Sequence, residues 1–287
     1  MLTQDEIERR RRFITATDVP KLFGRSPWGS AADVFWDKVG TRRFTGNAAT
    51  EAGTLLEPSV IAWAHQQLGG VVSGDWRVHE NGINACSLDA MTIDGEPVEA
   101  KTTGIVGPGT PHQWGDEGTD EIPEYYLLQV HAQLAVTGAP RAWVPALIGG
   151  RGFVMYRVQA SPAINEAIAR VSEQFWREHI EQNVQPEGCI PTLETMKGIR
   201  RTPGKEVAIA DELAADYLEK QAVAAAAAKD ADQAKAALIA ALADAETGAY
   251  SGGKFTFAEQ TRKGYTIEET TFRVLRHKVS KKGLVTV

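Results

Sequence analysis

The sequence predicts an α/β or α+β core with a mixed central sheet flanked by helices, followed by a C-terminal extension. Three observations predict it. Apolar residues recur with helical spacing over residues 47–68. Strand-like runs flank two hairpin turn pairs, Asp94-Gly95 and Gly149-Gly150. After residue 183 the composition changes to a Pro- and Gly-rich stretch and then to a long Ala-rich segment.

The elements follow in chain order from these patterns. The expected helices are 4–12, 30–39, 47–68, 123–137, 162–183 and 206–246, the last as one helix or a pair. The expected strands are 71–80, 84–92, 97–102, 141–148, 151–159, 254–260 and 265–275. Thr17 or Asp18 is expected as a helix N-cap. Pro58 removes a backbone donor inside the helix 47–68, so we expect a kink or a restart there.

Four segments result. Residues 1–183 form the core, and residues 184–205 form a linker. Residues 206–248 form an Ala-rich helical segment of high helix propensity but weak apolar stripe. Residues 249–287 form a small β unit with a basic tail.

Composition excludes several classes of protein. No apolar run reaches the length of a membrane span, and the two cysteines, Cys86 and Cys189, form neither a disulfide framework nor a metal-binding spacing. These features predict a cytoplasmic protein. The net charge of −6 argues against a protein that coats nucleic acid. Basic runs at 9–12 and 273–282 are either solvated surface or phosphate-facing patches.

The stretch SLDAMTIDGEPVEAKTTG, residues 87–104, carries the candidate chemistry. Asp89, Glu99 and Lys101 occur here among apolar residues, and buried charges are costly unless they are paired. Glu99 and Lys101 are two residues apart on a strand, so both point to one face while Ala100 points to the other. Carboxylates bind divalent cations, and a neighbouring ammonium can orient or deprotonate a water molecule.

The turn geometry places a condition on this metal site. A strict two-residue turn at Asp94-Gly95 pairs Asp89 with Ala100, so that Asp89 faces away from Glu99. The site therefore requires a bulge or a three-residue loop that shifts the pairing by one residue. Pro97 cannot donate to the strand ladder, which favours such an irregularity.

Residues elsewhere support the site. Glu57 follows two leucines in the string LLEP. Gln129 and Gln133 are four residues apart on a predicted helix, with Tyr126 one turn before Gln129. Each of these residues also has an explanation without a functional role. The charges can belong to a solvated face or a salt bridge, the glutamines can be exposed at the surface, and Tyr126 can pack in the core.

Together these residues resemble the lambda-type phage exonucleases, or YqaJ-like viral recombinases, of the PD-(D/E)XK nuclease superfamily. The resemblance runs from about residue 10 to about residue 181. It rests on a set of motifs in the right order: ITAT, FGRSPW, GTLLEP, SLDAMT with EAK, IPEYYLLQVHAQLAVTG and FW. It implies a restriction-endonuclease-like core. SLDA stands here in place of the usual S-P-D-G, and Thr17 in place of the commoner serine.

The resemblance implies a role for each matching residue. Asp89, Glu99 and the Ala100 carbonyl would bind one or two Mg²⁺ or Mn²⁺ ions, and Glu57 would assist a second ion or its waters. Lys101 would position or deprotonate the attacking water, and Gln129 would orient that water or the scissile phosphate. Arg10 and Thr17 would receive the 5′-phosphate of a DNA end, although Arg9 and Arg11 are also available. Tyr126 completes the expected DNA-contacting set.

The implied reaction is 5′ to 3′ hydrolysis of duplex DNA from an end, which releases mononucleotides and leaves 3′ single-stranded tails for recombination. The resemblance also implies a toroidal homo-oligomer, often a trimer, an annealing-protein partner and a phage or prophage origin within a bacterial host. The alternatives are a PD-(D/E)XK endonuclease or junction resolvase, a non-catalytic DNA-end-binding protein and a helical scaffold.

Overall fold

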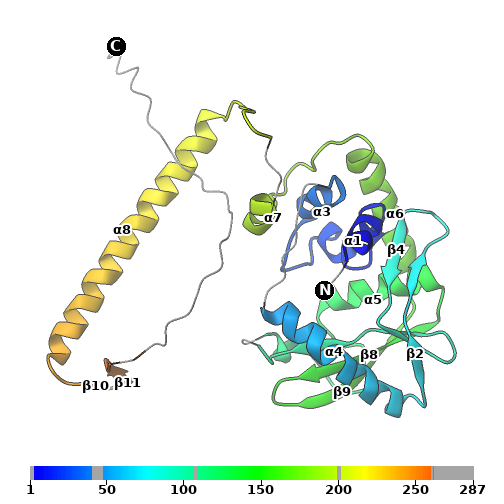
Figure 1. Cartoon of the computed structure of the whole chain (residues 1–287), viewed down its shortest axis with the longest axis horizontal. Helices are drawn as coiled ribbons and strands as arrows, with labels where there is room; N and C mark the ends of the chain where they lie inside the picture. Colours follow the sequence, from blue (N-terminus) through cyan, green and yellow to red (C-terminus); the bar gives the residue numbers. More distant parts are fainter. Residues whose placement is uncertain (1–2, 41–47, 107–108, 199–201, 260, 262–287) are drawn as a thin grey trace. The chain divides into compact units, whose positions relative to one another are not determined.

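The computed structural model describes residues 3–40, 48–106, 109–198, 202–259 and 261 (Figure 1). The chain divides into two units, Met1–Arg200 and Arg201–Val287. Among the described residues, no helix is both long enough and apolar enough to cross a membrane.

The first unit is built around a mixed sheet. Its strands, in spatial order, are β2 (Val71–Ser73), β5 (Ala90–Thr92), β6 (Pro97–Val98), β8 (Arg141–Ile148) and β7 (Lys101–Thr103), and β9 (Gly152–Gln159) pairs with β8. β5 runs antiparallel to β6, whereas β6 and β7 both run parallel to β8. This arrangement confirms the predicted mixed sheet.

A smaller sheet lies in the same unit. It joins β1 (Ile14–Thr15), β4 (Asn84–Ser87) and β3 (Trp76–Val78), with β1 parallel and β3 antiparallel to β4. The prediction of single strands over 71–80 and 84–92 was therefore wrong, because each range contributes one strand to each sheet. The chain segments approach closely where they change sheets. A Cβ atom at Gly74 would come within 2.0 Å of the Leu88 carbonyl oxygen.

Helices cover both faces of the larger sheet. Side chains of β8 alternate: Val144 and Ala146 join the core beneath α5 (Glu124–Thr137), and Trp143 joins the core beneath α4 (Ala48–Gln67). Figure 1 shows α4 crossing β8 and β9, which it also contacts. Pro58 lies inside α4, which is one continuous helix, so the expected restart does not occur.

The unit Met1–Arg200 contains further helices. They are α1 (Gln4–Arg11), α2 (Val19–Leu22), α3 (Ala31–Lys38), α6 (Pro162–Phe175) with a π-helical continuation (Trp176–Ile180), and α7 (Leu193–Gly198), together with a 3₁₀ turn (Pro111–Gln113). α7 lies within the segment that we expected to be a linker. Asp18 occupies the N-cap of α2, but its side chain makes no capping hydrogen bond.

The second unit contains one long helix and a hairpin. α8 (Asp211–Leu242) is a single helix of 32 residues, so the alternative of a helical pair is wrong. β10 (Thr247–Tyr250) pairs antiparallel with β11 (Gly253–Thr256). β10 was not predicted as a strand. The predicted strand 265–275 and the basic run 273–282 lie outside the described residues.

Candidate active site

The loop between β5 and β6 determines whether the two hairpin carboxylates meet. The Thr92 N–H donates to the Glu96 carbonyl over 2.9 Å, which leaves a three-residue loop ending at Gly95. Gly95 has φ +83°, a conformation that glycine adopts without strain. Ala90 consequently pairs with Val98, and Asp89 lies beside Glu99. The strict two-residue register is not adopted, and the one-residue shift that the site requires is present, as predicted.

Glu99 is the centre of the cluster. Its side chain is 4% exposed and forms an ion pair with Lys101. Glu99 lies in the two-residue interruption between β6 and β7, and Lys101 is the first residue of β7. Both strands pair with β8 in one continuous register. The Glu99 N–H donates to the Trp143 carbonyl, which fixes the backbone at this point. Glu99 and Lys101 therefore share a face of the sheet, as their spacing predicted.

Two glutamines of α5 bind the same carboxylate. Gln129 Nε2 donates to Glu99 Oε1, and Gln133 Nε2 donates to Glu99 Oε2, each over 2.5 Å. Residues four apart on a helix lie on one face, so a single helix reaches both oxygens. Both glutamines are buried, which excludes the surface alternative. Gln133 was noted as a neighbour of Gln129 but was not assigned a role, because its spacing alone does not identify a partner.

Asp89 is linked to the cluster through the backbone. Its Oδ2 accepts a hydrogen bond from the Ala100 N–H over 2.9 Å. Burial and the nearby charge of Glu99 raise the pKa of Asp89 well above its ordinary value, against the opposing charge of Lys101. The pKa of Lys101 is raised: burial alone would lower it, but the carboxylates of Glu99 and Asp89 outweigh that effect and favour the ammonium form.

Glu57 and Tyr126 approach the cluster from two helices. Glu57, on α4, is the most exposed of the four charged residues, and partial burial together with the charge of Glu99 raises its pKa. Tyr126, on α5, places its ring 4.7 Å from the Lys101 ammonium, close enough for a cation–π contact. Tyr126 also contacts Trp114, so the core-packing alternative holds in part.

The donor set of this cluster fits a hard divalent cation. The carboxylates of Glu57, Asp89 and Glu99 outnumber the single ammonium of Lys101. Gln133 Oε1 is a buried acceptor with no hydrogen-bond donor among the described residues. No three Asp, Glu, His or Cys side chains within the described ranges are close enough to form an all-protein metal cage. Mg²⁺ does not need one, because it binds through one or two carboxylates and keeps several waters.

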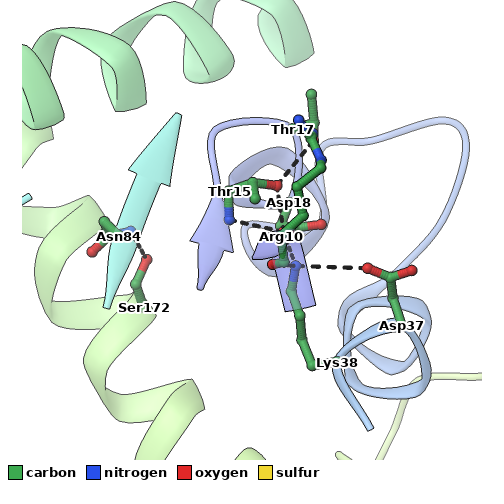
Figure 2. Close-up of polar contacts among 8 residues, drawn as sticks. All are labelled: Arg10, Thr15, Thr17, Asp18, Asp37, Lys38, Asn84 and Ser172. Atoms are coloured by element: carbon green, nitrogen blue, oxygen red, sulfur yellow. Dashed lines mark hydrogen bonds and ion pairs between the residues drawn. The ribbon is translucent and has the colours of Figure 1, made fainter. Parts of the chain in front are cut away.

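Arg10 and Thr17 meet at the end of α1. Arg10 Nη2 donates to Thr17 Oγ1 over 3.0 Å, and Thr15 Oγ1 lies 3.1 Å from the same hydroxyl (Figure 2). The structure thus brings together the two residues that the resemblance assigns to a 5′-phosphate. Arg9 is engaged elsewhere, with its guanidinium 4.7 Å from the Trp76 ring.

A buried ion pair supports this arrangement. Lys38 Nζ lies 2.6 Å from Asp18 Oδ2 and donates to the Arg10 carbonyl over 3.1 Å (Figure 2). Asp18 Oδ2 also accepts from both the N–H and the hydroxyl of Thr15. Burial alone would raise the pKa of Asp18, but the positive charge of Lys38 outweighs it and lowers the pKa. Lys38 was not identified from the sequence, because its partners Asp18 and Arg10 are 20 and 28 positions away in the chain.

β4 connects the Arg10 region to the carboxylate cluster. Thr15 on β1 pairs with Ala85 on β4, which leads directly to Asp89. Asn84 on the same strand donates to Ser172 Oγ over 2.8 Å (Figure 2). Burial and the charge of Glu99 raise the pKa of the Cys86 thiol to about 12, so this cysteine is a packing residue.

The family comparison agrees with this geometry. Residues 7–140 match the model of the YqaJ-like viral recombinase domain. The uncharacterized protein YqaJ of Bacillus subtilis (strain 168) is 27% identical to this chain over 188 residues. The match covers 62% of this chain and 57% of that protein, so this chain spans less than two thirds of its relative.

Solved structures of exonucleases have a similar fold. The alkaline exonuclease LHK-Exo from Laribacter hongkongensis is similar with a TM-score of 0.50 and 19% identity, over 63% of this chain and 94% of that one. Its complex with dAMP gives a TM-score of 0.51 at the same identity and coverage. The mixed sheet and its helices therefore have the PD-(D/E)XK fold of phage-type exonucleases, as predicted.

Proposed function

We propose that this chain is a phage-type exonuclease that hydrolyses phosphodiester bonds at the ends of duplex DNA with one or two Mg²⁺ or Mn²⁺ ions. The observation that carries the proposal is the cluster around Glu99: Asp89 lies beside it and Lys101 is paired with it. The cluster lies in a fold shared with an alkaline exonuclease.

Each residue then has a distinct task. Asp89, Glu99 and the Ala100 carbonyl would hold the ion, and Glu57 would hold a second ion or its waters. When bound, the metal polarises the phosphoryl group and lowers the pKa of a water. Lys101 holds its ammonium beside Glu99 and orients the attacking water, and Gln129 keeps the Glu99 carboxylate in place. Tyr126 restricts the ammonium through its ring.

The direction of hydrolysis is proposed to be 5′ to 3′, with release of mononucleotides and 3′ single-stranded tails as the product. The paired Arg10 and Thr17 support it, since a guanidinium and a hydroxyl are suited to a terminal phosphate. The protein groups in the cluster address the phosphodiester and not base edges, so we expect low sequence specificity and strong salt dependence.

The assembly is proposed to be a homo-oligomeric ring, with a single-strand annealing protein as a functional partner. A ring whose channel gathers the basic groups would let a chain with a net charge of −6 enclose DNA. Light scattering of the purified chain measures the number of protomers, and a monomer would contradict this part of the proposal.

The test compares a linear duplex with a closed circle of the same sequence, each incubated with Mg²⁺ or with EDTA. Mg²⁺-dependent release of mononucleotides from the linear duplex alone is the expected result. Cutting of the circle would identify an endonuclease or junction resolvase instead. Binding of ends without any cleavage would leave a non-catalytic end-binding protein.

A further inference from the structure

Trp28 is an exposed aromatic residue beside the candidate active site. Its side chain is 59% exposed, the highest exposure of any aromatic residue among those described in the unit Met1–Arg200. An indole is large and mostly apolar, so a soluble domain usually covers it when no partner requires it. The exposure of Trp28 therefore needs a physical explanation.

The indole is fixed in place by its neighbours. Its ring centroid lies 4.6 Å from that of Tyr125 at an interplanar angle of 77°, an edge-to-face contact. The Tyr125 hydroxyl lies 3.0 Å from Thr110 Oγ1, which anchors this tyrosine. On the same loop, Arg25 pairs with Glu124 over 3.3 Å, which ties the loop to the start of α5. Edge-to-face packing leaves indole surface uncovered on a rigid support.

One tyrosine links the indole to the active-site lysine. The Tyr126 ring centroid lies 5.9 Å from that of Trp28 and 4.7 Å from the Lys101 ammonium. Trp28 and Lys101 are thus neighbours of the same ring. Trp28 is therefore within about three nucleotides of a phosphate held at Lys101, because successive phosphates of one strand are about 3.4 Å apart along a helix.

We propose that Trp28 is a stacking surface for a nucleobase within three nucleotides of the scissile phosphate. The inference rests on the proposed DNA substrate. Stacking on an aromatic face tolerates every base, because each base has a π-face, and so agrees with low sequence specificity. The stacked base would position the terminal nucleotide for hydrolysis and help to separate it from its pairing partner.

The test pairs a change in the protein with a change in the DNA. Trp28→Ala and the native chain are compared on a normal linear duplex and on duplexes with one abasic residue at each of the first three positions of either strand. The readouts are end binding by fluorescence anisotropy in EDTA and the initial rate of nucleotide release with Mg²⁺. Binding decides the stacking proposal even if no cleavage occurs, so the two proposals fail separately.

We expect Trp28→Ala to weaken binding of the normal duplex about tenfold. On the one duplex whose abasic residue removes the stacked base, Trp28→Ala and the native chain should bind equally well. Trp28→Phe should retain most of the affinity, whereas Trp28→Leu, apolar but without a ring, should behave like alanine. Tyr250→Ala, which removes another exposed ring at 57% exposure, is the matched control.

Three results would overturn the proposal: no loss of affinity, an equal loss on every abasic duplex, or a loss that Trp28→Phe fails to restore. An equal loss of affinity on all duplexes would show that Trp28 contacts the DNA backbone and not a base. Because the indole is exposed, the melting temperature of Trp28→Ala should stay within a few degrees of the native value.

Discussion

Gln133 donates a hydrogen bond to Oε2 of Glu99 from a side chain that has no exposed surface. Gln129 donates to the other oxygen, so the two amides fix the plane of the carboxylate. A carboxylate fixed in this way presents its remaining lone pairs in one direction. The orientation of Glu99 is therefore set by α5 and not only by its own strand.

Replacing Gln133 with leucine should lower the rate of nucleotide release. The substitution removes a charge-assisted hydrogen bond from Glu99, which we propose as a metal ligand, and we expect a decrease in kcat of about ten- to a hundredfold. Steady-state kinetics on a linear duplex measures it. Gln159→Leu, at an exposed position at the end of β9, is the control and should retain the native rate. A native rate in Gln133→Leu would show that Glu99 does not need this bond.

Replacing Lys38 with methionine should destabilise the fold. The Lys38 side chain is 1% exposed, and its removal leaves the Asp18 charge buried without its partner, which costs about 3–5 kcal/mol. Chemical denaturation measures the loss. Combining Lys38→Met with Asp18→Leu removes both charges and should restore part of the stability. Additive losses in the double variant would contradict the pairing.

The Asp18 carboxyl should make stability depend on pH in acid. Its pKa is lowered from 3.8 in the folded chain, so the unfolded chain takes up this proton first as the pH falls. The stabilisation is complete above the ordinary pKa and is lost below it. Asp18→Asn should be less stable at neutral pH, and the difference from the native chain should shrink between about pH 5 and about pH 3. A difference in stability that stays constant over that pH range would contradict the lowered pKa of Asp18.

Replacing Arg10 with alanine should reduce the preference for 5′-phosphorylated ends. Arg10 contacts Thr17, whereas Arg12, in the same basic run, is exposed and supplies the control as Arg12→Ala. The measurement is kcat/KM on duplexes with a 5′-phosphate or a 5′-hydroxyl. We expect about a tenfold loss with Arg10→Ala on the phosphorylated end only. Equal losses on both ends would assign Arg10 to general DNA binding.

The sequence predicted the parts of the fold that depend on local pattern. The hairpin of β8 and β9 and the helix α5 lie close to the expected ranges, because their periodicity and turn residues are strong. The strands 71–80 and 84–92 were wrong because the change between two sheets depends on the close approach of Gly74 and Leu88, which no local pattern reveals.

In the candidate site, too, features with a local sequence pattern were predicted and features that depend on tertiary packing were not. The spacing of Glu99 and Lys101 and of the two glutamines was visible in the sequence, and the structure brings all four side chains together. Lys38 could not be found in this way, because its partner Asp18 and the Arg10 carbonyl become neighbours only after α1, α2 and α3 pack.

The measurement that tests the central claim most directly is the initial rate of mononucleotide release from a linear duplex with Mg²⁺, for the native chain and for Lys101→Ala. End binding is measured in parallel by anisotropy. The account predicts a rate at least about a hundredfold lower in the variant, with end binding retained. A native rate in Lys101→Ala would contradict the assignment of the hydrolytic site to the cluster around Glu99.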